Sequence, residues 1–147
     1  MRRLKRFAAM PRRERRLLLR SFIWISAVRI GLWVLPLRVI RSIILSYGKD
    51  SRNDFVDEVV RAVRTSSRYV PGASCLTQAL AAQALLAGSN HQSRIEIGVA
   101  KEGELFAAHA WLVCDEQIVL GGPDVTRYVP LASWEAKEKG LSHSRMV

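Results

Sequence analysis

The sequence predicts an α+β domain in which a layer of helices precedes a small antiparallel sheet. Residues 12–87 contain long apolar segments that are broken by proline, glycine and short polar stretches, which is typical of packed helices. Residues 94–120 instead contain short alternating or apolar segments between turn residues, which is typical of strands. With 49% hydrophobic and 24% charged residues, 147 residues suffice for one buried core but not for two large domains.

Positive charge is concentrated in the first third of the chain. Residues 1–50 contain 13 Lys/Arg and 2 acidic residues, a net charge of +11. Residues 51–147 contain 10 Lys/Arg and 11 acidic residues, a net charge of −1. We therefore divide the chain into a basic, apolar N-terminal helical region (1–50) and a domain of ordinary charge (51–147) that carries the chemistry.

Two helices are expected in the N-terminal region. Pro11 is typical of a helix start and precedes the basic run 12–16. The segment from Leu17 to Leu45 is strongly apolar, and Pro36 divides it into helices of roughly 21–34 and 37–46. Arginines interrupt the segment, so no stretch reaches the roughly 18 uncharged residues that a membrane-spanning helix needs. These arginines are Arg20, Arg29, Arg38 and Arg41.

Three roles fit this basic region. We favour helices packed on the domain with an exposed basic rim, and the alternatives are a membrane-surface anchor and a docking surface for an acidic protein or peptide. Nucleic-acid binding is not expected, because no recognition motif accompanies the charge. The basic start lacks the uninterrupted apolar segment and the cleavage site of a signal peptide. We expect a cytoplasmic protein, with membrane association through residues 1–50 as the alternative.

A second pair of helices follows. Asn53 is a suitable cap for a short amphipathic helix whose inner face consists of Phe55, Val56, Val59, Val60 and Val63. Residues 65–68 read as a linker. The turn 71–74 then ends in Ser74, a good N-cap for the Ala- and Leu-rich helix 75–87, which Gly88 terminates.

The strands come next in the chain. Residues 94–99 alternate as a half-buried strand does, and Gly103 marks a turn before the long strand Leu105–Cys114. A two-residue turn at Asp115-Glu116 leads to the returning strand Gln117–Leu120, and residues 121–123 end it. Trp134 and a short Glu/Lys-rich helix are expected to close the chain.

The candidate catalytic residues are Cys75 and His109. Cys75 occupies the first turn of its helix, where unpaired N–H groups and the helix dipole favour the nucleophilic thiolate. His109 lies in a nearly all-apolar strand, where an imidazole is unusual. A helix-start Cys facing a strand His is the arrangement of papain-like and transglutaminase-like enzymes, with Cys as nucleophile and His as general base and acid. The sequence therefore predicts a papain/transglutaminase-like core, a Cys-bearing helix packed on the sheet.

The other cysteine and histidines receive no role. Cys114 lies an odd number of residues from His109 and should face the opposite side of the sheet, as a small buried hydrophobic residue. A metal site formed by Cys75, His109 and Cys114 matches no zinc spacing, so no metal is expected. His91 and His143 fall in a polar loop and in the tail.

A third residue usually orients the catalytic imidazole. If Asp115-Glu116 is a two-residue turn, then His109 pairs with Gly122, which has no side chain. A four-residue loop over 115–118 would place Asp124 opposite His109, but it would expose Ile118, so we rank it lower. Asp124 could also reach the site if the chain turns at Pro123. Asp124 is therefore the candidate third member.

Three segments resemble a known family. Ser74-Cys75-Leu76 before an Ala/Leu-rich helix, then Ile97-Gly98-Val99, then the FAAHAWL run 106–112, resemble the stand-alone leader peptidases of lasso peptide biosynthesis, usually called biosynthesis protein B. The resemblance covers about residues 70–130. It implies a transglutaminase-like cysteine protease that removes the leader from a ribosomally made precursor peptide, with Cys75 and His109 as its catalytic pair. The Asp that the family carries on the next strand falls by register on Gly122, which leaves Asp124 or a Cys–His dyad.

The resemblance also implies partners: the precursor peptide, a small leader-recognition protein and the lasso cyclase. No cofactor is expected, because the chain has no phosphate-binding glycine motif; any ATP requirement would come through the cyclase. Two rival functions are another Cys–His acyl-transfer enzyme of transglutaminase type and a non-catalytic scaffold of the maturation complex.

Overall fold

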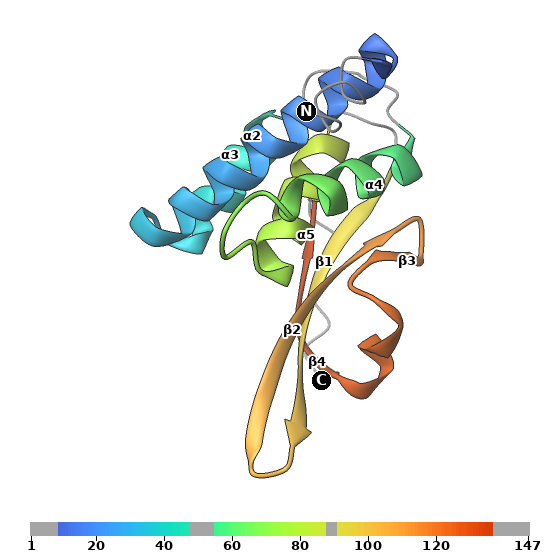
Figure 1. Ribbon diagram of the computed structural model, residues 1–147. Coiled ribbons are helices and arrows are strands. Elements are labelled where there is room, and N and C mark those ends of the chain that lie inside the picture. The colour runs from blue at the N-terminus through green and yellow to red at the C-terminus, as the bar shows by residue number, and fades with distance from the viewer. Residues whose placement is uncertain (1–8, 48–54, 88–90, 137–147) are drawn as a thin grey trace.

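The computed structural model describes residues 9–47, 55–87 and 91–136 and confirms the α+β class (Figure 1). In these residues the helices are α2 (Arg12–Val34), α3 (Leu37–Tyr47), α4 (Val56–Ser67) and α5 (Cys75–Leu86). The strands are β1 (Ser93–Glu102), β2 (Leu105–Cys114), β3 (Gln117–Leu120) and β4 (Val129–Glu135), with the 3-10 helix η1 (Pro123–Arg127) between the last two. They form one antiparallel sheet in the order β3-β2-β1-β4.

Helix α5 is the centre of the molecule. One side packs on β1 and β2, and the other helices cover the rest of it, so the helices gather at one end while the β1–β2 hairpin projects from the other (Figure 1). Nine of its 12 residues are buried, which explains why its sequence is apolar on every face. Gln83, one of its two buried polar residues, donates from Nε2 to the carbonyl of Trp134 at 3.4 Å. This bond connects the helix to the edge strand β4.

The N-terminal helices form a packed layer, the arrangement favoured from the sequence. Pro11 precedes α2, and Pro36 separates it from α3. The side of α2 that faces α4 and α5 buries Leu17, Ser21, Ile25 and Val28. By length and composition α2 is the one described helix that could cross a membrane, although 22% of its apolar window is buried in the structure. The segment contains Arg20 and Arg29, so the sequence observation that no stretch reaches about 18 uncharged residues still holds.

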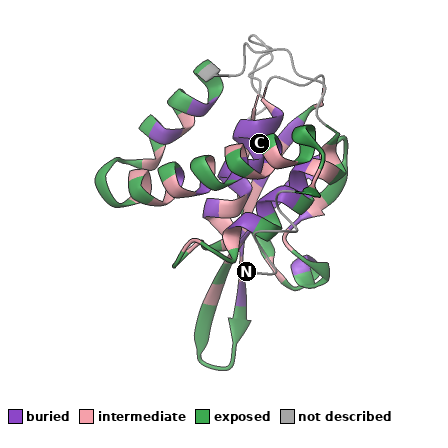
Figure 2. Ribbon diagram, turned by 45° about the horizontal axis from the view of Figure 1, so that its top comes forward, coloured by how far each residue is buried: buried purple, intermediate pink, exposed green. Residues whose placement is uncertain are grey.

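The opposite side of α2 is apolar and exposed. It consists of residues spaced three, four or seven apart, which lie on one helical face. We call this set the outer apolar face: Leu19, Phe22, Ile23, Ile30, Trp33 and Val34. Figure 2 shows the alternation of buried and exposed residues along the helices. Trp33, at 78% exposed, and Val34, at 75%, are among the most exposed large apolar side chains of the described chain.

Three sequence expectations were wrong. The predicted linker 65–68 belongs largely to α4, which continues to Ser67. Phe55 lies at the N-cap of α4 and is 62% exposed, so it is not part of the buried face that Val59, Val60 and Val63 form. The strand β4 was not expected, and Trp134 lies in it and pairs with Ile95 of β1. The expected cap Asn53, the stop Gly88 and most of the predicted closing helix lie outside the described residues.

Candidate active site

Cys75 is the first residue of α5, as the sequence predicted. Ser74 caps the helix: its Oγ accepts from the N–H of Thr77 at 3.3 Å and lies 3.0 Å from the Thr77 hydroxyl. The turn before it contains Gly72 at a φ of +73°, where a Cβ would lie 2.6 Å from the guanidinium of Arg29 in α2. The N-terminal layer therefore contacts the turn that presents the cysteine.

His109 is held by a backbone carbonyl. Its Nε2 lies 2.7 Å from the carbonyl oxygen of Gly121, 12 residues later in the chain. Because a carbonyl can only accept a hydrogen bond, Nε2 carries the hydrogen and Nδ1 is the proton acceptor of the neutral ring. The rings of Tyr128, at a centroid distance of 5.0 Å, and Trp111, at 6.3 Å, flank the imidazole.

The register at this point differs from the predicted one by a single residue. The two-residue turn at Asp115 and Glu116 is confirmed, since both have positive φ and Cys114 pairs with Gln117. The ladder then shifts by one position, so that Leu112 pairs with Leu120. With this shift a continued ladder would place residue 123 opposite His109, but the described ladder ends at Leu112, so the predicted pairing of His109 with Gly122 is not formed. The group that meets the imidazole belongs to Gly121.

Gly121 can only be a glycine. Its φ is +132°, and a Cβ at this position would lie 2.3 Å from the Cβ of Trp111. The backbone of residue 121 thus approaches β2 more closely than any side chain would allow. That close approach brings its carbonyl within reach of His109.

Trp111 is itself fixed by a chain of polar contacts. Its indole Nε1 donates to Glu96 at 2.8 Å, and Arg94 donates to the same carboxylate at 2.8 Å. The end of the indole lies over Gly98 of β1, where a Cβ would be 2.8 Å away. These contacts hold the indole that stacks beside His109 in one position on the sheet.

Cys75 and His109 line the same cavity. It has a volume of about 430 Å³ and lies where α5, the middle of β2 and the chain after β3 meet. Its lining residues are Arg64, Cys75, Gln78, His109, Ala110, Leu120, Gly121, Gly122 and Pro123. Gln78 also donates from Nε2 to the carbonyl of Ala73 at 3.3 Å, which stabilises the turn before the cysteine.

Asp124 does not line this cavity. It is exposed in the first turn of η1, and within the described residues no hydrogen bond or ion pair joins it to His109. Gly122 lines the cavity at a φ of +85° and a ψ of 175°, a conformation that is essentially restricted to glycine. The residue at which the sequence-based register placed the missing Asp thus has a backbone that disfavours a side chain.

Cys114 lies apart from the cavity, on the face of the sheet that α5 covers. Burial raises the pKa of its thiol to about 11, and the neighbouring carboxylate of Asp115 contributes less. The three residues Cys75, His109 and Cys114 are therefore not brought together.

Sequence reasoning missed two features of the site. One is Arg64, whose place at the cavity depends on how α4 packs, which no local pattern reveals. The other is Tyr128, which follows η1 and whose ring centroid lies 5.0 Å from that of His109. The sequence feature that could have indicated the place of Tyr128 is the turn at Pro123, after which the chain returns across the sheet.

A comparison with protein-family models identifies the transglutaminase-like superfamily, matched over residues 22–133. The match begins within α2 and extends into β4, so it includes part of the basic N-terminal region as well as the sheet. Neither the search of curated proteins nor that of solved structures finds a match. Since the family model covers well over half of the sequence, the chain belongs to the transglutaminase-like superfamily.

Proposed function

We propose that this chain is a cysteine peptidase that cleaves the leader from a ribosomally synthesised lasso precursor peptide. The observation that carries the proposal is the shared cavity of Cys75 and His109, with the cysteine at a helix start and the imidazole held in one orientation. The superfamily's chemistry, acyl transfer by a Cys–His pair, agrees with this arrangement. The choice of a lasso precursor rests on the resemblance of residues 70–130.

The proposed mechanism uses only groups of the cavity. His109 takes the thiol proton of Cys75 on Nδ1, and the thiolate attacks the carbonyl carbon of the scissile amide. The N–H of Cys75, in the first turn of α5, is the first donor to the oxyanion. The imidazolium protonates the leaving amine, which departs as the thioester forms. Water, deprotonated by His109, then hydrolyses the thioester and returns the thiol.

We assign the orienting role to the Gly121 carbonyl rather than to Asp124. A carbonyl fixes the tautomer as a carboxylate does, but it carries only a partial negative charge and stabilises the imidazolium less. The proposed enzyme is thus a Cys–His dyad with a backbone orienting group. The stability of its thiolate–imidazolium pair therefore depends more on the surrounding protein than it does in an enzyme with a full Cys–His–Asp triad.

An extended peptide is the substrate that fits the sheet best. Among the described strands, β3 pairs with β2 only from Leu112 to Cys114. The edge of β2 that precedes Leu112 on this side has no described partner strand, and His109 lies on that stretch. A substrate strand could add to this edge and so pass the cavity. Arg64 at the cavity rim would attract acidic residues of such a peptide.

The proposed protein partners follow from the resemblance of residues 70–130. A leader-recognition protein would deliver the precursor, and the lasso cyclase would use the freed amino terminus. Membrane-surface contact is supported by a specific observation: the outer apolar face of α2 belongs to a region of net charge +11. Exposed Trp33 beside arginines on a helix is the composition of an interfacial helix on anionic lipid.

The test is cleavage of the cognate precursor, with the recognition protein present, followed by mass spectrometry. The intact protein, Cys75→Ala and the matched control Cys114→Ala are compared at equal folded concentration. Leader release by the intact protein and by Cys114→Ala, but not by Cys75→Ala, would support the proposal. Equal release of the leader by all three proteins would show that Cys75 is not the nucleophile.

The same assay separates the two rivals. If a primary amine added to the reaction becomes attached to the peptide in place of water, the chain is an acyl transferase. If no variant cleaves although the complex with precursor and recognition protein forms, the chain is a scaffold. In that case the loss of a carboxylate at position 122 would be the natural explanation.

A further inference from the structure

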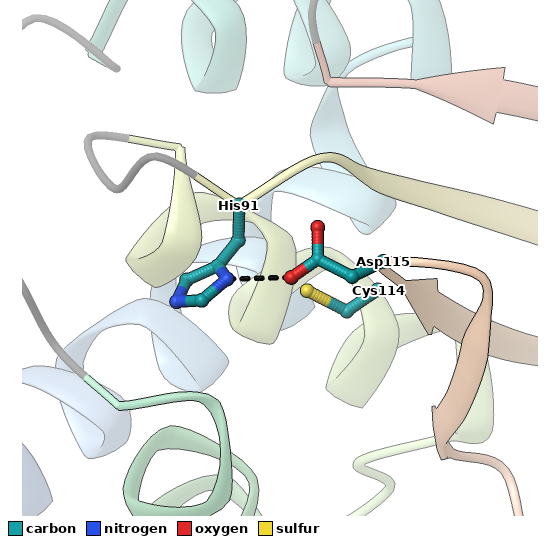
Figure 3. Close-up of side chains that lie close together, drawn as sticks. All are labelled: His91, Cys114 and Asp115. Carbon is teal, nitrogen blue, oxygen red and sulfur yellow. Dashed lines mark hydrogen bonds and ion pairs between the residues drawn. The ribbon is translucent and has the colours of Figure 1, made fainter.

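A second cluster of reactive side chains lies at the far end of the β2–β3 turn, away from the cavity. His91 follows α5 in the chain, while Cys114 and Asp115 end β2 and begin its turn (Figure 3). One ligand atom from each of the three lies within 4.8 Å of the others, and no other described residues form such a group. In Figure 3 the sulfur of Cys114 points toward the imidazole and lies beside the carboxylate.

We propose that His91, Cys114 and Asp115 bind one Zn²⁺ ion, independently of the function proposed for the cavity. Thiolate, imidazole and carboxylate are the three protein ligands that Zn²⁺ uses, and a water molecule would complete a tetrahedron. Ligand bonds of about 2.0–2.3 Å place such atoms roughly 3.5 Å apart, so the cluster must contract by about an ångström. The side chains of His91 and Asp115 are 36% and 54% exposed and can rotate toward the buried sulfur.

The scaffold already holds two of these ligands in place. Nδ1 of His91 lies 2.6 Å from Oδ2 of Asp115, and the N–H of Gln92 donates to the other carboxylate oxygen at 3.1 Å. The N–H of Asp115 donates in turn to the carbonyl of Gln92 at 2.9 Å. The segment after α5 and the β2–β3 turn are thus joined before any ion binds. A metal would replace the His–Asp hydrogen bond by two coordinate bonds.

Two observations are not explained by an ion pair alone. The hydroxyl of Ser93 is buried, has no hydrogen-bond partner, and belongs to the residue directly opposite Cys114 in the β1–β2 ladder. Directly paired residues share a face of the sheet, so this hydroxyl is available to a thiolate or to a metal-bound water. The Cys114 sulfur also lies beside the Asp115 carboxylate and points toward the imidazole of His91, an arrangement that the His91–Asp115 contact does not require.

The charges of the proposed site balance. Binding releases the thiol proton of Cys114 to solvent, and the thiolate and the Asp115 carboxylate together neutralise Zn²⁺ while His91 stays uncharged. Arg94, which follows Ser93 in the chain, donates hydrogen bonds to Glu96 at 2.8 Å and to Glu116 at 2.7 Å. The positive charge of Arg94 is therefore already balanced by the carboxylates of Glu96 and Glu116.

The test uses the full chain carrying Cys75→Ala, so that Cys114 is the remaining thiol. After chelation and dialysis, Co²⁺ is added as a spectroscopic probe, and Zn²⁺ is used to compete for it. The proposal expects a thiolate-to-cobalt charge-transfer band at one ion per chain, displaced by Zn²⁺. His91→Gln and Asp115→Asn should each weaken binding at least tenfold, because each removes a ligand from a partly exposed position without disturbing the core.

The matched control is His109→Gln, which removes an imidazole at the other end of β2 and should leave the band and the affinity unchanged. Absence of the band in the Cys75→Ala protein would overturn the proposal. A band whose affinity falls less than tenfold in His91→Gln would overturn it as well. Because His91 is exposed on a loop, this variant stays folded even if Cys114→Ser does not.

Discussion

The Nε2 atom of His109 and the carbonyl oxygen of Gly121 are 2.7 Å apart, and this contact exists because residue 121 has no side chain. The backbone can approach β2 at this point only in the space that a Cβ would take from Trp111. The orientation of the imidazole therefore depends on the absence of a side chain at residue 121. This relationship gives the first prediction.

Replacing Gly121 by Ala should lower kcat/KM of the proposed cleavage by about 100-fold. The methyl group would force the chain away from Trp111, and misplacing a catalytic group by about an ångström has consequences of that size. The measurement is steady-state cleavage, with far-ultraviolet circular dichroism to confirm folding. Gly103→Ala is the matched control, since Gly103 also has a positive φ but lies at the tip of the β1–β2 hairpin with no atom near. An equal loss in both variants would point to general destabilisation instead.

Introducing a carboxylate by Gly122→Asp should not increase activity. Residue 122 has a φ of +85° and a ψ of 175°, so an aspartate there would be strained and would not reach the imidazole without moving the backbone. We expect a lower melting temperature and unchanged or reduced cleavage. A higher cleavage rate would show that one substitution can restore a third catalytic residue. It would also show that the Gly121 carbonyl orients the imidazole less well than a carboxylate does.

The two cysteines should differ sharply toward alkylating reagents. At pH 8 only about one Cys114 side chain in a thousand is thiolate, because burial raises its pKa to about 11, and its sulfur is enclosed by the core. Iodoacetamide should therefore modify Cys75 first in the native, metal-free protein. Peptide mapping by mass spectrometry would give the ratio of the two products. Comparable labelling under native conditions would contradict the burial of Cys114, and labelling in denaturant provides the reference.

Arg64 should affect substrate binding more than the chemical step. It lines the catalytic cavity, and in the described residues no carboxylate pairs with it. Arg64→Gln should raise KM for an acidic precursor several-fold, with a smaller effect at high salt because the attraction is screened. Arg61→Gln is the control, since Arg61 lies one turn earlier on the groove between α2 and α4. A fall in kcat with unchanged KM would assign Arg64 to catalysis instead.

The outer apolar face should bind anionic vesicles. We expect the full chain to float with phosphatidylserine-containing liposomes and not with neutral ones. The double variant Ile30→Ser and Trp33→Ser should lose most of this binding, because it removes two side chains that are 63% and 78% exposed. Leu131→Ser, a 67% exposed position on β4, is the control. Flotation that survives the double variant would exclude this face as the contact.

The sequence was sufficient for the parts of the fold that depend on local chemistry. Ser74 is a strong helix cap, so the position of Cys75 could be read directly, and Asp115-Glu116 could be recognised as a two-residue turn. The β-bulge after Val113 could not be predicted, because it arises from packing between strands. The ladder ends at Leu112, before it reaches His109, and the imidazole instead meets the backbone carbonyl of Gly121.

Longer-range contacts were also beyond the sequence. The strand β4 was missed because Val129–Glu135 gains its conformation by pairing with an edge of β1 that exists only in the fold. The cluster of His91 and Asp115 was missed for the same reason, since 23 residues separate Gln92 from the carboxylate that its N–H meets. Contacts of this kind can be predicted only once the register between β1 and β2 is known.

The contact between Arg29 and Gly72 has a consequence for how this protein can be dissected. Helix α2 covers α5 and reaches the turn before Cys75, so the basic region and the sheet are parts of one folding unit. Deletion mapping would therefore mislead: a fragment that starts after residue 50 would expose the buried flank of α5 and lose activity for structural reasons. Lipid binding and catalysis can be separated only by point substitutions on surfaces that the core does not use.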